Sequence, residues 1–393
     1  MKILCFLCVE SPSCLVPPKP RGFNRLAKVA SFGKSFAVSP RSIPASNQVH
    51  FNHNRSQSNR ATKALAFAAL LVCGTGPLWA GELSGPWVAI MQENDLVVRT
   101  DRHYTQGLKI GYLARERAPE DAGWLARWTD CLPPLGVKPE AYRGGLSLGQ
   151  TIYTPTDITT RALQQADRPY AGLLQVSLLL QRRGQTASET PVLDHLQLDL
   201  GVIGPPSLAE QAQNTVHRLR NFGLAMGWDN QLKTEPTLGL KLQRTWRYGC
   251  GNPDGFAAEF LPHAGASVGN SVTFAALGGQ LRAGYRLPRD FGTTTIDSIL
   301  PGSGGRSAGA HRGFYLFTEV EGRAIAYNAF LDGGLFHDGH HVGKHPGVGD
   351  AKLGFVFVLK RWDISYTQIA RTKEFAGQKE IDAFGSLALR FKW

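Results

Sequence analysis

Hydrophobic and polar residues alternate with a period of two along most of the chain from residue 81 to the C-terminus. The clearest run is DAFGSLALRFKW, in which every second residue from Leu387 to Trp393 is apolar. A second run, His195–Gly204, places leucines and a valine between Gln, Asp and Gly. In a strand, such alternation puts an apolar face opposite a polar face. The pattern therefore predicts an all-β fold.

About a dozen segments alternate in this way, each near the ~10 residues that a tilted strand needs to cross a bilayer. They begin near residues 87, 106, 145, 171, 194, 237, 257, 274, 313, 350, 362 and 382. Phe314–Asn328 reads either as one strand or as a hairpin turning at Gly322, and an even total favours one strand. We therefore expect residues 81–393 to form a 12-stranded antiparallel transmembrane β-barrel in the outer membrane.

A soluble periplasmic β-sandwich also alternates, so this pattern leaves two architectures. Two features favour the barrel. The chain ends on an alternating strand with a terminal aromatic residue, Trp393. The polar face also carries many Arg, Gln and Asp residues, which suit a polar lumen better than the second face of a sandwich.

One region has a different period. In Leu208–Arg220, apolar residues recur at spacings of four, four and three, which is typical of a helix. The region lies between Pro205-Pro206 and Gly223, so it predicts a short helix that joins two strands.

Residues 60–80, RATKALAFAALLVCGTGPLWA, have the pattern of a secretory signal peptide. Arg60 and Lys63 precede an apolar core that is too short to span a bilayer, and a small-residue stretch ends at Ala80. Residues 1–59 are basic and lack periodicity, so we read them as an N-terminal extension outside the fold. They are either an upstream-extended reading frame or a transit peptide.

The distribution of charge and of cysteines limits the possible partners and covalent links of the protein. The chain has 43 Lys and Arg against 31 Asp and Glu, but residues 1–80 hold ten of the basic residues and one acid. Residues 81–393 carry 33 basic and 30 acidic groups, so they lack the excess of positive charge that would indicate binding to nucleic acid. Outside residues 1–80 the cysteines are Cys131 and Cys250, which lack metal-ligand spacing and would form one disulfide if they lie close together.

Three segments offer candidate chemistry. Gln92–Tyr112 gathers carboxylate and amide oxygens at the end of the first strand, which suits either a calcium ion or a solvated hairpin loop. His217 on the predicted helix is either a structural residue or a general base. The His-rich tract HDGHHVGKH, around His340, reads as a surface loop more readily than as a metal site. No Gly-x-Ser-x-Gly, phosphate-loop or His-Glu-x-x-His motif occurs from residue 81 onward.

Six blocks occur in order: ENDLVVRTDRHYTQG, GQTIYTPTD, DRPYAG, LGVIGPP, QNTVHRL and GWDNQL. Together they resemble the outer-membrane lipid A 3′-O-deacylase family, over about residues 90–247. The resemblance implies a 12-stranded barrel that hydrolyses the 3′-linked acyloxyacyl ester of lipid A in the outer leaflet, with calcium. The family's Asn-Asp pair falls on Asn94 and Asp95, its Tyr-Thr-x-Gly on Tyr104, Thr105 and Gly107, and its histidine on His217.

By that likeness, His217 activates water as a general base and Asn94 helps to position the reacting groups. Asp95 and the Thr105 carbonyl hold calcium, and Tyr104 belongs to the substrate site. Two departures stand out. Gly223 replaces an acidic residue expected six positions after the histidine, which weakens the predicted calcium site. Thr160 and Arg161 stand where a lysine is expected, and an Arg still suits a lipid A phosphate.

We therefore expect a monomeric calcium-dependent esterase whose substrate is lipid A, within lipopolysaccharide. An outer-membrane phospholipase with the same ester chemistry is one alternative. A non-catalytic barrel, either a porin or a degenerate family member, is the other. Lipid A from expressing cells would separate the three.

Overall fold

The protein is described by a computed structural model over residues 83–95, 103–129, 136–252, 254–293, 295–296 and 312–393. The signal peptide, the N-terminal extension and Cys131 lie outside these residues, so the expectations for them stay predictions. The described elements are β1 (Trp87–Asn94), β2 (His103–Leu113), η2 (Pro119–Asp121), α2 (Trp124–Thr129), β3 (Lys138–Thr154), β4 (Ala171–Gln185), β5 (Pro191–Ile203), η3 (Pro205–Ser207), α3 (Ala209–Leu219), η4 (Trp228–Asn230), β6 (Glu235–Trp246), β7 (Tyr248–Gly251), β8 (Phe256–Gly269), β9 (Val272–Tyr285), β10 (Gly313–Asn328), α4 (Ala329–Asp332), β11 (Gly347–Val358), β12 (Trp362–Arg371) and β13 (Asp382–Lys392).

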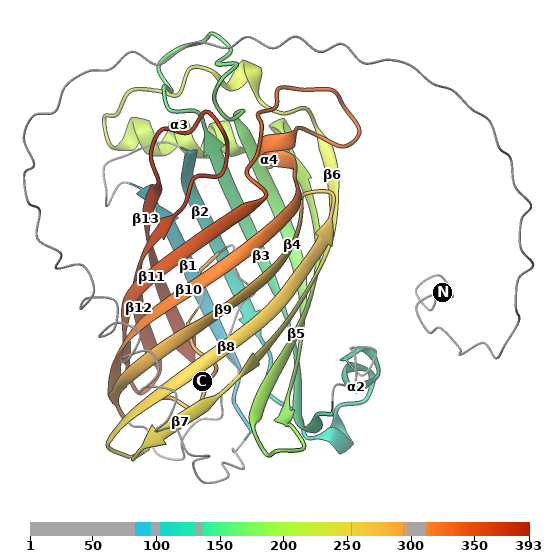
Figure 1. Ribbon diagram of the computed structural model, residues 1–393, viewed down its shortest axis with the longest axis vertical. Coiled ribbons are helices and arrows are strands. Elements are labelled where there is room, and N and C mark those ends of the chain that lie inside the picture. Colours follow the sequence, from blue (N-terminus) through green and yellow to red (C-terminus); the bar gives the residue numbers. More distant parts are fainter. Residues whose placement is uncertain (1–82, 96–102, 130–135, 253, 294, 297–311) are drawn as a thin grey trace, which may run out of the picture. The chain divides into compact units, whose positions relative to one another are not determined.

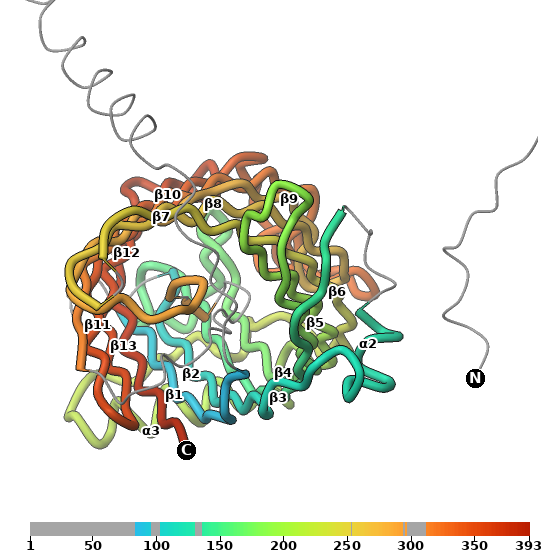
Figure 2. Tube along the Cα trace, turned by 90° about the horizontal axis from the view of Figure 1, so that it is seen from below, coloured from blue at the N-terminus to red at the C-terminus, as the bar shows by residue number. Residues whose placement is uncertain are grey.

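The strands form one closed antiparallel barrel (Figures 1 and 2). Apart from β6 and β7, which do not pair with each other, each strand pairs with its neighbour in the chain. β1 pairs with β13, and β6 pairs with β8 to close the ring. Thr245 of β6 lies opposite His263, and Tyr248 of β7 lies opposite Phe260, so the register of β8 runs unbroken past both. β6 and β7 are therefore one strand interrupted at Arg247, and the thirteen segments make the twelve strands that the alternation predicts.

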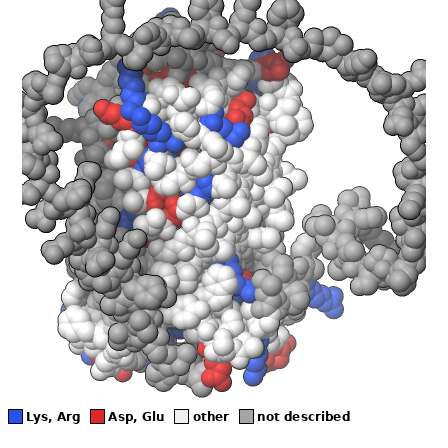
Figure 3. Space-filling view, in the orientation of Figure 1, with Lys and Arg blue, Asp and Glu red and all other residues white. Residues whose placement is uncertain are grey.

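Side chains alternate between the outside and the lumen, as the sequence pattern indicates. On β11, Leu353 is 65% exposed and faces outward, whereas its neighbour Lys352 is buried inside. The visible outer face is mostly uncharged, with scattered charged side chains (Figure 3). A barrel with an apolar outer band and a polar interior is stable in a membrane, because every strand edge is paired.

Aromatic side chains mark the end of the barrel at which both β1 begins and β13 ends. Tyr112 stacks on Trp393 with ring centroids 6.3 Å apart, and Trp362 lies 4.6 Å from Phe391. Three short connections, residues 186–190, 252–255 and 359–361, lie at this end. Short turns are typical of the periplasmic side of such barrels, so the opposite end, with α3 and α4, is extracellular.

The described part of the lumen is filled by charged pairs and by the chain itself. Glu319 accepts from Lys352 at 2.8 Å, and Asp350 accepts from Arg371 at 2.8 Å. The chain that follows β9 runs inside the barrel, and the Ile296 amide donates at 2.7 Å to Glu93, which lies near the extracellular end of β1. A cavity of about 90 Å³ lies in the lumen, and Lys109, Arg323 and Arg371 are among the residues that line it. Charged pairs and the chain itself therefore occupy much of the described lumen.

Three sequence expectations about individual elements are confirmed. Gly313–Asn328 is a single strand, and the helix predicted at 208–220 is α3. The twelve strands begin close to their predicted positions, although β3 extends seven residues further back, to Lys138. The short helices α2 and α4 were not predicted. Among the described residues, no helix is long and apolar enough to cross a membrane.

Candidate functional site

Helix α3 lies outside the ring of strands, near the extracellular end (Figures 1 and 2). It begins over Gly172 of β4, where an added Cβ would come within 2.2 Å of Ala209 Cβ. Gln150 of β3 donates to the Ser207 carbonyl at 2.6 Å, just before the helix. In both views the helix extends past β3 toward β1 and β13. Only a glycine at residue 172 lets α3 approach the wall this closely.

An apolar cluster holds α3 and the chain that follows it against the wall. Its buried members are Ile152, Tyr170, Ala209, Ala225 and Trp228. The Trp228 indole donates to Gln213 on the helix at 2.9 Å, which satisfies its buried N–H. The helix is therefore a fixed part of the barrel exterior.

His217 lies in the last turn of α3 and is 5% exposed. Its Nδ1 lies 2.5 Å from the carbonyl oxygen of Gly223, and the Phe222 ring meets the imidazole edge-on at 5.9 Å. A carbonyl oxygen can only accept, so Nδ1 carries the hydrogen. In the neutral ring, Nε2 therefore holds the lone pair, which is the form that a general base needs.

Asn94 ends strand β1 on the side of the wall toward which α3 extends. Glu93 points into the lumen and is fully buried, so the next side chain, Asn94, points outward. Asn94 lies opposite Gln106, and its Nδ2 donates to the Thr105 carbonyl at 3.1 Å. This bond fixes the orientation of the Asn94 amide.

Thr105 is the extra residue of a β-bulge between Tyr104 and Gln106 in the pairing of β2 with β3. A bulge leaves one residue out of the ladder and re-aims its neighbours. The Asp95 carboxylate is 2% exposed beside this hairpin. Asp95, Asn94 and the Thr105 carbonyl are all oxygen donors, the type that calcium prefers, so the described residues fit such an ion. Gly223 adds no carboxylate; its carbonyl orients His217 instead.

Tyr104 and Arg161 lie in different surroundings from His217. Tyr104 is 1% exposed in the lumen, where its hydroxyl donates to Glu93 at 2.8 Å. This position suits support of the wall better than contact with a lipid outside it. Arg161 is exposed in the β3–β4 loop, and its carbonyl accepts from Asn230 at 2.8 Å, so the loop lies beside the chain after α3.

His103 also belongs to this end of the barrel, although the sequence did not single it out. Its Nδ1 lies 2.7 Å from Asp382, and its Nε2 lies 3.2 Å from the Thr156 hydroxyl. The backbone φ of His103 is 64°, a left-handed conformation that residues other than glycine rarely adopt. These bonds tie the start of β2 to the start of β13 and to the β3–β4 loop. The only sequence signal was a histidine next to the Tyr-Thr-x-Gly block.

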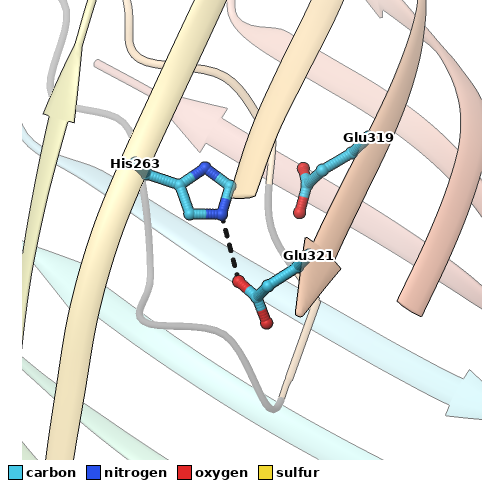
Figure 4. Close-up of side chains that lie close together, drawn as sticks. All are labelled: His263, Glu319 and Glu321. Atoms are coloured by element: carbon cyan, nitrogen blue, oxygen red, sulfur yellow. Dashed lines mark hydrogen bonds and ion pairs between the residues drawn. The ribbon is translucent and has the colours of Figure 1, made fainter. Parts of the chain in front are cut away.

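The predicted His-rich loop is fastened to its surroundings. His340 Nε2 lies 2.7 Å from the Asp167 carbonyl, and Lys344 pairs with Asp332 at 3.0 Å. In the described part of the chain, the one group of metal-type ligands is elsewhere, at His263, Glu319 and Glu321 in the lumen (Figure 4).

Donors already surround the carboxylates of that lumen group. Glu319 accepts from Lys352 and Gln280, each at 2.8 Å. Glu321 accepts from Arg323 at 2.6 Å and lies 3.1 Å from His263. A cation would have to displace these partners, so the cluster is best described as a charge network that fills the lumen.

Comparison with known proteins identifies the family. The family model described as outer membrane protein LpxR matches residues 65–393. The comparison with curated proteins returns no match.

A solved structure of similar fold supports the architecture. LpxR from Salmonella typhimurium is similar with a TM-score of 0.63 and 18% sequence identity, over 78% of this chain and 100% of that chain. The β domain of the Bordetella autotransporter BrkA has a TM-score of 0.39 and 11% identity, over 79% of this chain and 100% of its own. The first match shows the barrel fold, and the family model covers far more than half of the chain. The chain therefore belongs to the LpxR family of outer membrane proteins.

Proposed function

We propose that this protein is a calcium-dependent esterase that removes the 3′-linked acyloxyacyl group from lipid A in the outer leaflet of the outer membrane. One observation carries the proposal. His217, with its Nδ1 hydrogen bonded to the Gly223 carbonyl, lies on a helix outside the barrel at the extracellular end. Membership of the LpxR family supports the same conclusion.

His217 is the proton acceptor in this proposal. Nε2 takes a proton from water as the water attacks the ester carbonyl, and the Gly223 carbonyl stabilises the imidazolium that forms. A positioned general base ordinarily contributes ~10²–10⁴-fold in rate. Burial of His217 and the Phe222 ring limit the orientations of the imidazole, so the lone pair is held in one direction.

Asn94 and Asp95 have supporting roles. The Asn94 amide, fixed by the Thr105 carbonyl, orients the ester or the attacking water. Asp95, Asn94 and the Thr105 carbonyl would hold calcium; a carbonyl has two lone pairs, so Thr105 can serve Asn94 and an ion together. When bound, calcium supplies positive charge that stabilises the oxyanion developing on the ester.

The position of the site suits a lipid substrate. A lipid reaches the outside of the wall laterally, so its acyl chains stay in the bilayer while the ester meets the polar residues. Exposed Arg161 is available at the extracellular end for a lipid A phosphate. The filled lumen argues against a porin. The substrate site lies on one chain, so we also propose a monomer.

The test is the lipid A of Gram-negative cells that express the protein, analysed by mass spectrometry. Loss of the 3′ acyloxyacyl group supports the proposal. Lysophospholipid without a change in lipid A would identify a phospholipase, and no change in either would identify a non-catalytic barrel.

His217→Ala is the decisive variant, and His337→Ala is its control because His337 is exposed in the α4–β11 loop. We expect His217→Ala to lose deacylation by about 10²–10⁴-fold and His337→Ala to keep it. Both variants must show the gel mobility shift on heating that marks a folded barrel. Normal turnover in folded His217→Ala would exclude His217 as the base.

A further inference from the structure

Helix α2 lies against the outer surface of the barrel, at the periplasmic end (Figures 1 and 2). Its buried residue Leu125 packs with Tyr142 of β3 and Leu180 of β4. An added Cβ on Gly144 would lie 3.1 Å from Leu125, so the helix sits directly on the wall. A six-residue helix is not stable alone in water, so this contact keeps it folded.

The exposed side of α2 carries two tryptophans. Trp124 is 54% exposed and Trp128 is 49% exposed. They are four residues apart, so they share one helix face, and Arg127 is exposed beside them. The face therefore combines two large amphipathic rings with one cation.

The strand register places this face close to the aromatic ring of the barrel, the girdle of side chains formed at the periplasmic end by Tyr112, Trp362, Phe391 and Trp393. Tyr112, which stacks on Trp393, lies opposite Leu146 of β3. Leu146 is exposed on the outer wall, and Gly144, under α2, is the next outward position on the same strand. Two residues of a tilted strand span roughly 5–7 Å, so α2 lies about one residue pair from the aromatic ring, on the periplasmic side.

We propose that α2 is an interfacial anchor whose Trp124 and Trp128 insert into the headgroup layer of the periplasmic leaflet. Tryptophan favours that layer, because its ring is apolar and its N–H is polar. Arg127 extends toward the phosphate groups of the same lipids. The partner is thus the phospholipid surface, and the face continues the membrane contact of the strands.

The size of the face argues against a protein partner. An aromatic side chain buries about 150–250 Å² in full, and these two are half-exposed, so together they offer roughly 150–250 Å². A specific protein interface needs about 1,000 Å² or more. Insertion of a side chain into a lipid headgroup layer requires no such minimum contact area.

The experiment uses the full mature chain in phosphatidylcholine vesicles whose lipids carry bromine either near the headgroup or near the chain end. Tryptophan emission of the parent minus that of Trp124→Phe/Trp128→Phe isolates the two α2 indoles. Phenylalanine keeps the face apolar, so the helix keeps its place. Two matched differences serve as references: Trp362→Phe on the lipid-facing aromatic ring, and Trp228→Phe, whose indole is 2% exposed under α3.

We expect the α2 difference emission to be quenched as strongly as that of Trp362, and more by bromine near the headgroup than by bromine near the chain end. Quenching no greater than for Trp228, together with strong quenching by water-soluble acrylamide, would show that the face meets water and would overturn the proposal. If the double variant does not fold, Trp124→Phe and Trp128→Phe are measured singly with the same criteria.

Discussion

Gly172→Ala tests whether the close packing of α3 against the barrel wall determines the deacylation rate. A Cβ at residue 172 would lie 2.2 Å from Ala209 Cβ and 2.2 Å from Ser207 Oγ. Carbon atoms pack at about 3.5–4.0 Å, so the start of α3 must move away by roughly 1.3–1.8 Å, or the wall must bend. Overpacking of this kind costs about 1–3 kcal/mol. The barrel closes through its strands, so it should still form.

We expect deacylation by Gly172→Ala to fall about a hundredfold, because a displacement of ~1 Å away from the chemistry can cost that much in rate. A hundredfold loss corresponds to about 2.7 kcal/mol of transition-state stabilisation. The assay is the initial rate of lipid A deacylation in isolated outer membranes, at equal amounts of folded barrel. The control is Gly149→Ala on β3, where the nearest atom to an added Cβ is 3.7 Å away.

Ala209→Gly in the Gly172→Ala background relieves one of the two close contacts and should restore part of the rate. Full activity of folded Gly172→Ala would mean that the helix accommodates the methyl group without moving the site. An equal loss in Gly149→Ala would mean that any added side chain on these strands disturbs the barrel. Either result would refute the argument that the close approach at Gly172 places His217.

Three further predictions concern other parts of the chain. Gly223→Asp should lower the calcium concentration at half-maximal activity, because an added Cβ meets nothing within 4 Å and a carboxylate strengthens an oxygen site; an unchanged calcium titration would place the ion elsewhere. Phe222→Ala should lower the deacylation rate by about threefold to tenfold, since an aromatic contact of ~0.5–1.5 kcal/mol orients His217, whereas an unchanged rate would show that the ring has no such role. Burial raises the pKa of Glu116, but the charges of Arg183 and Arg143, with the hydrogen bonds from Arg183 and the Ser84 amide, together outweigh it and hold that pKa below the ordinary 4.5. The Glu116–Arg183 pair therefore stabilises the barrel at neutral pH and loses this contribution as pH falls below about 4.5. Glu116→Gln should lower the unfolding temperature of the barrel, measured by the gel mobility shift, more at pH 7 than at pH 4. Equal effects at both pH values would contradict this prediction.

Period-two alternation predicted the strands, because each strand has a lipid face and a lumen face. The terminal Trp393 and the many charged and amide residues on the polar face then favoured the barrel over a sandwich. An even number of strands favoured β10 as a single strand over a hairpin, and in the structure Gly322 continues the pairing with Leu277 and Gly349. The sequence pattern missed α2, because six residues contain too little of a helical period to stand out. The interruption of β6 and β7 at Arg247 was equally invisible, since alternation resumes on either side.

The candidate site was predicted less completely. The resemblance indicated His217, Asn94 and Asp95, and the structure places α3 and the end of β1 on the same outer side. The sequence did not predict that Gly223 acts through its backbone, because a residue type says nothing about where its carbonyl points. It also did not join His263 to Glu321, which are 58 positions apart and meet only when β8 and β10 turn the same face inward.

The location of α3 outside the wall changes the meaning of substrate concentration for this protein. A lipid substrate reaches the site by diffusion within one leaflet. The rate should therefore depend on the mole fraction of substrate among the lipids of that leaflet, and not on its bulk concentration. Adding inert detergent at constant bulk substrate should slow turnover by dilution in two dimensions. In the proposed reaction both products leave within or above that leaflet and do not pass through the lumen. That reaction therefore needs no pore, and we expect many copies of this barrel to leave the permeability of the outer membrane unchanged.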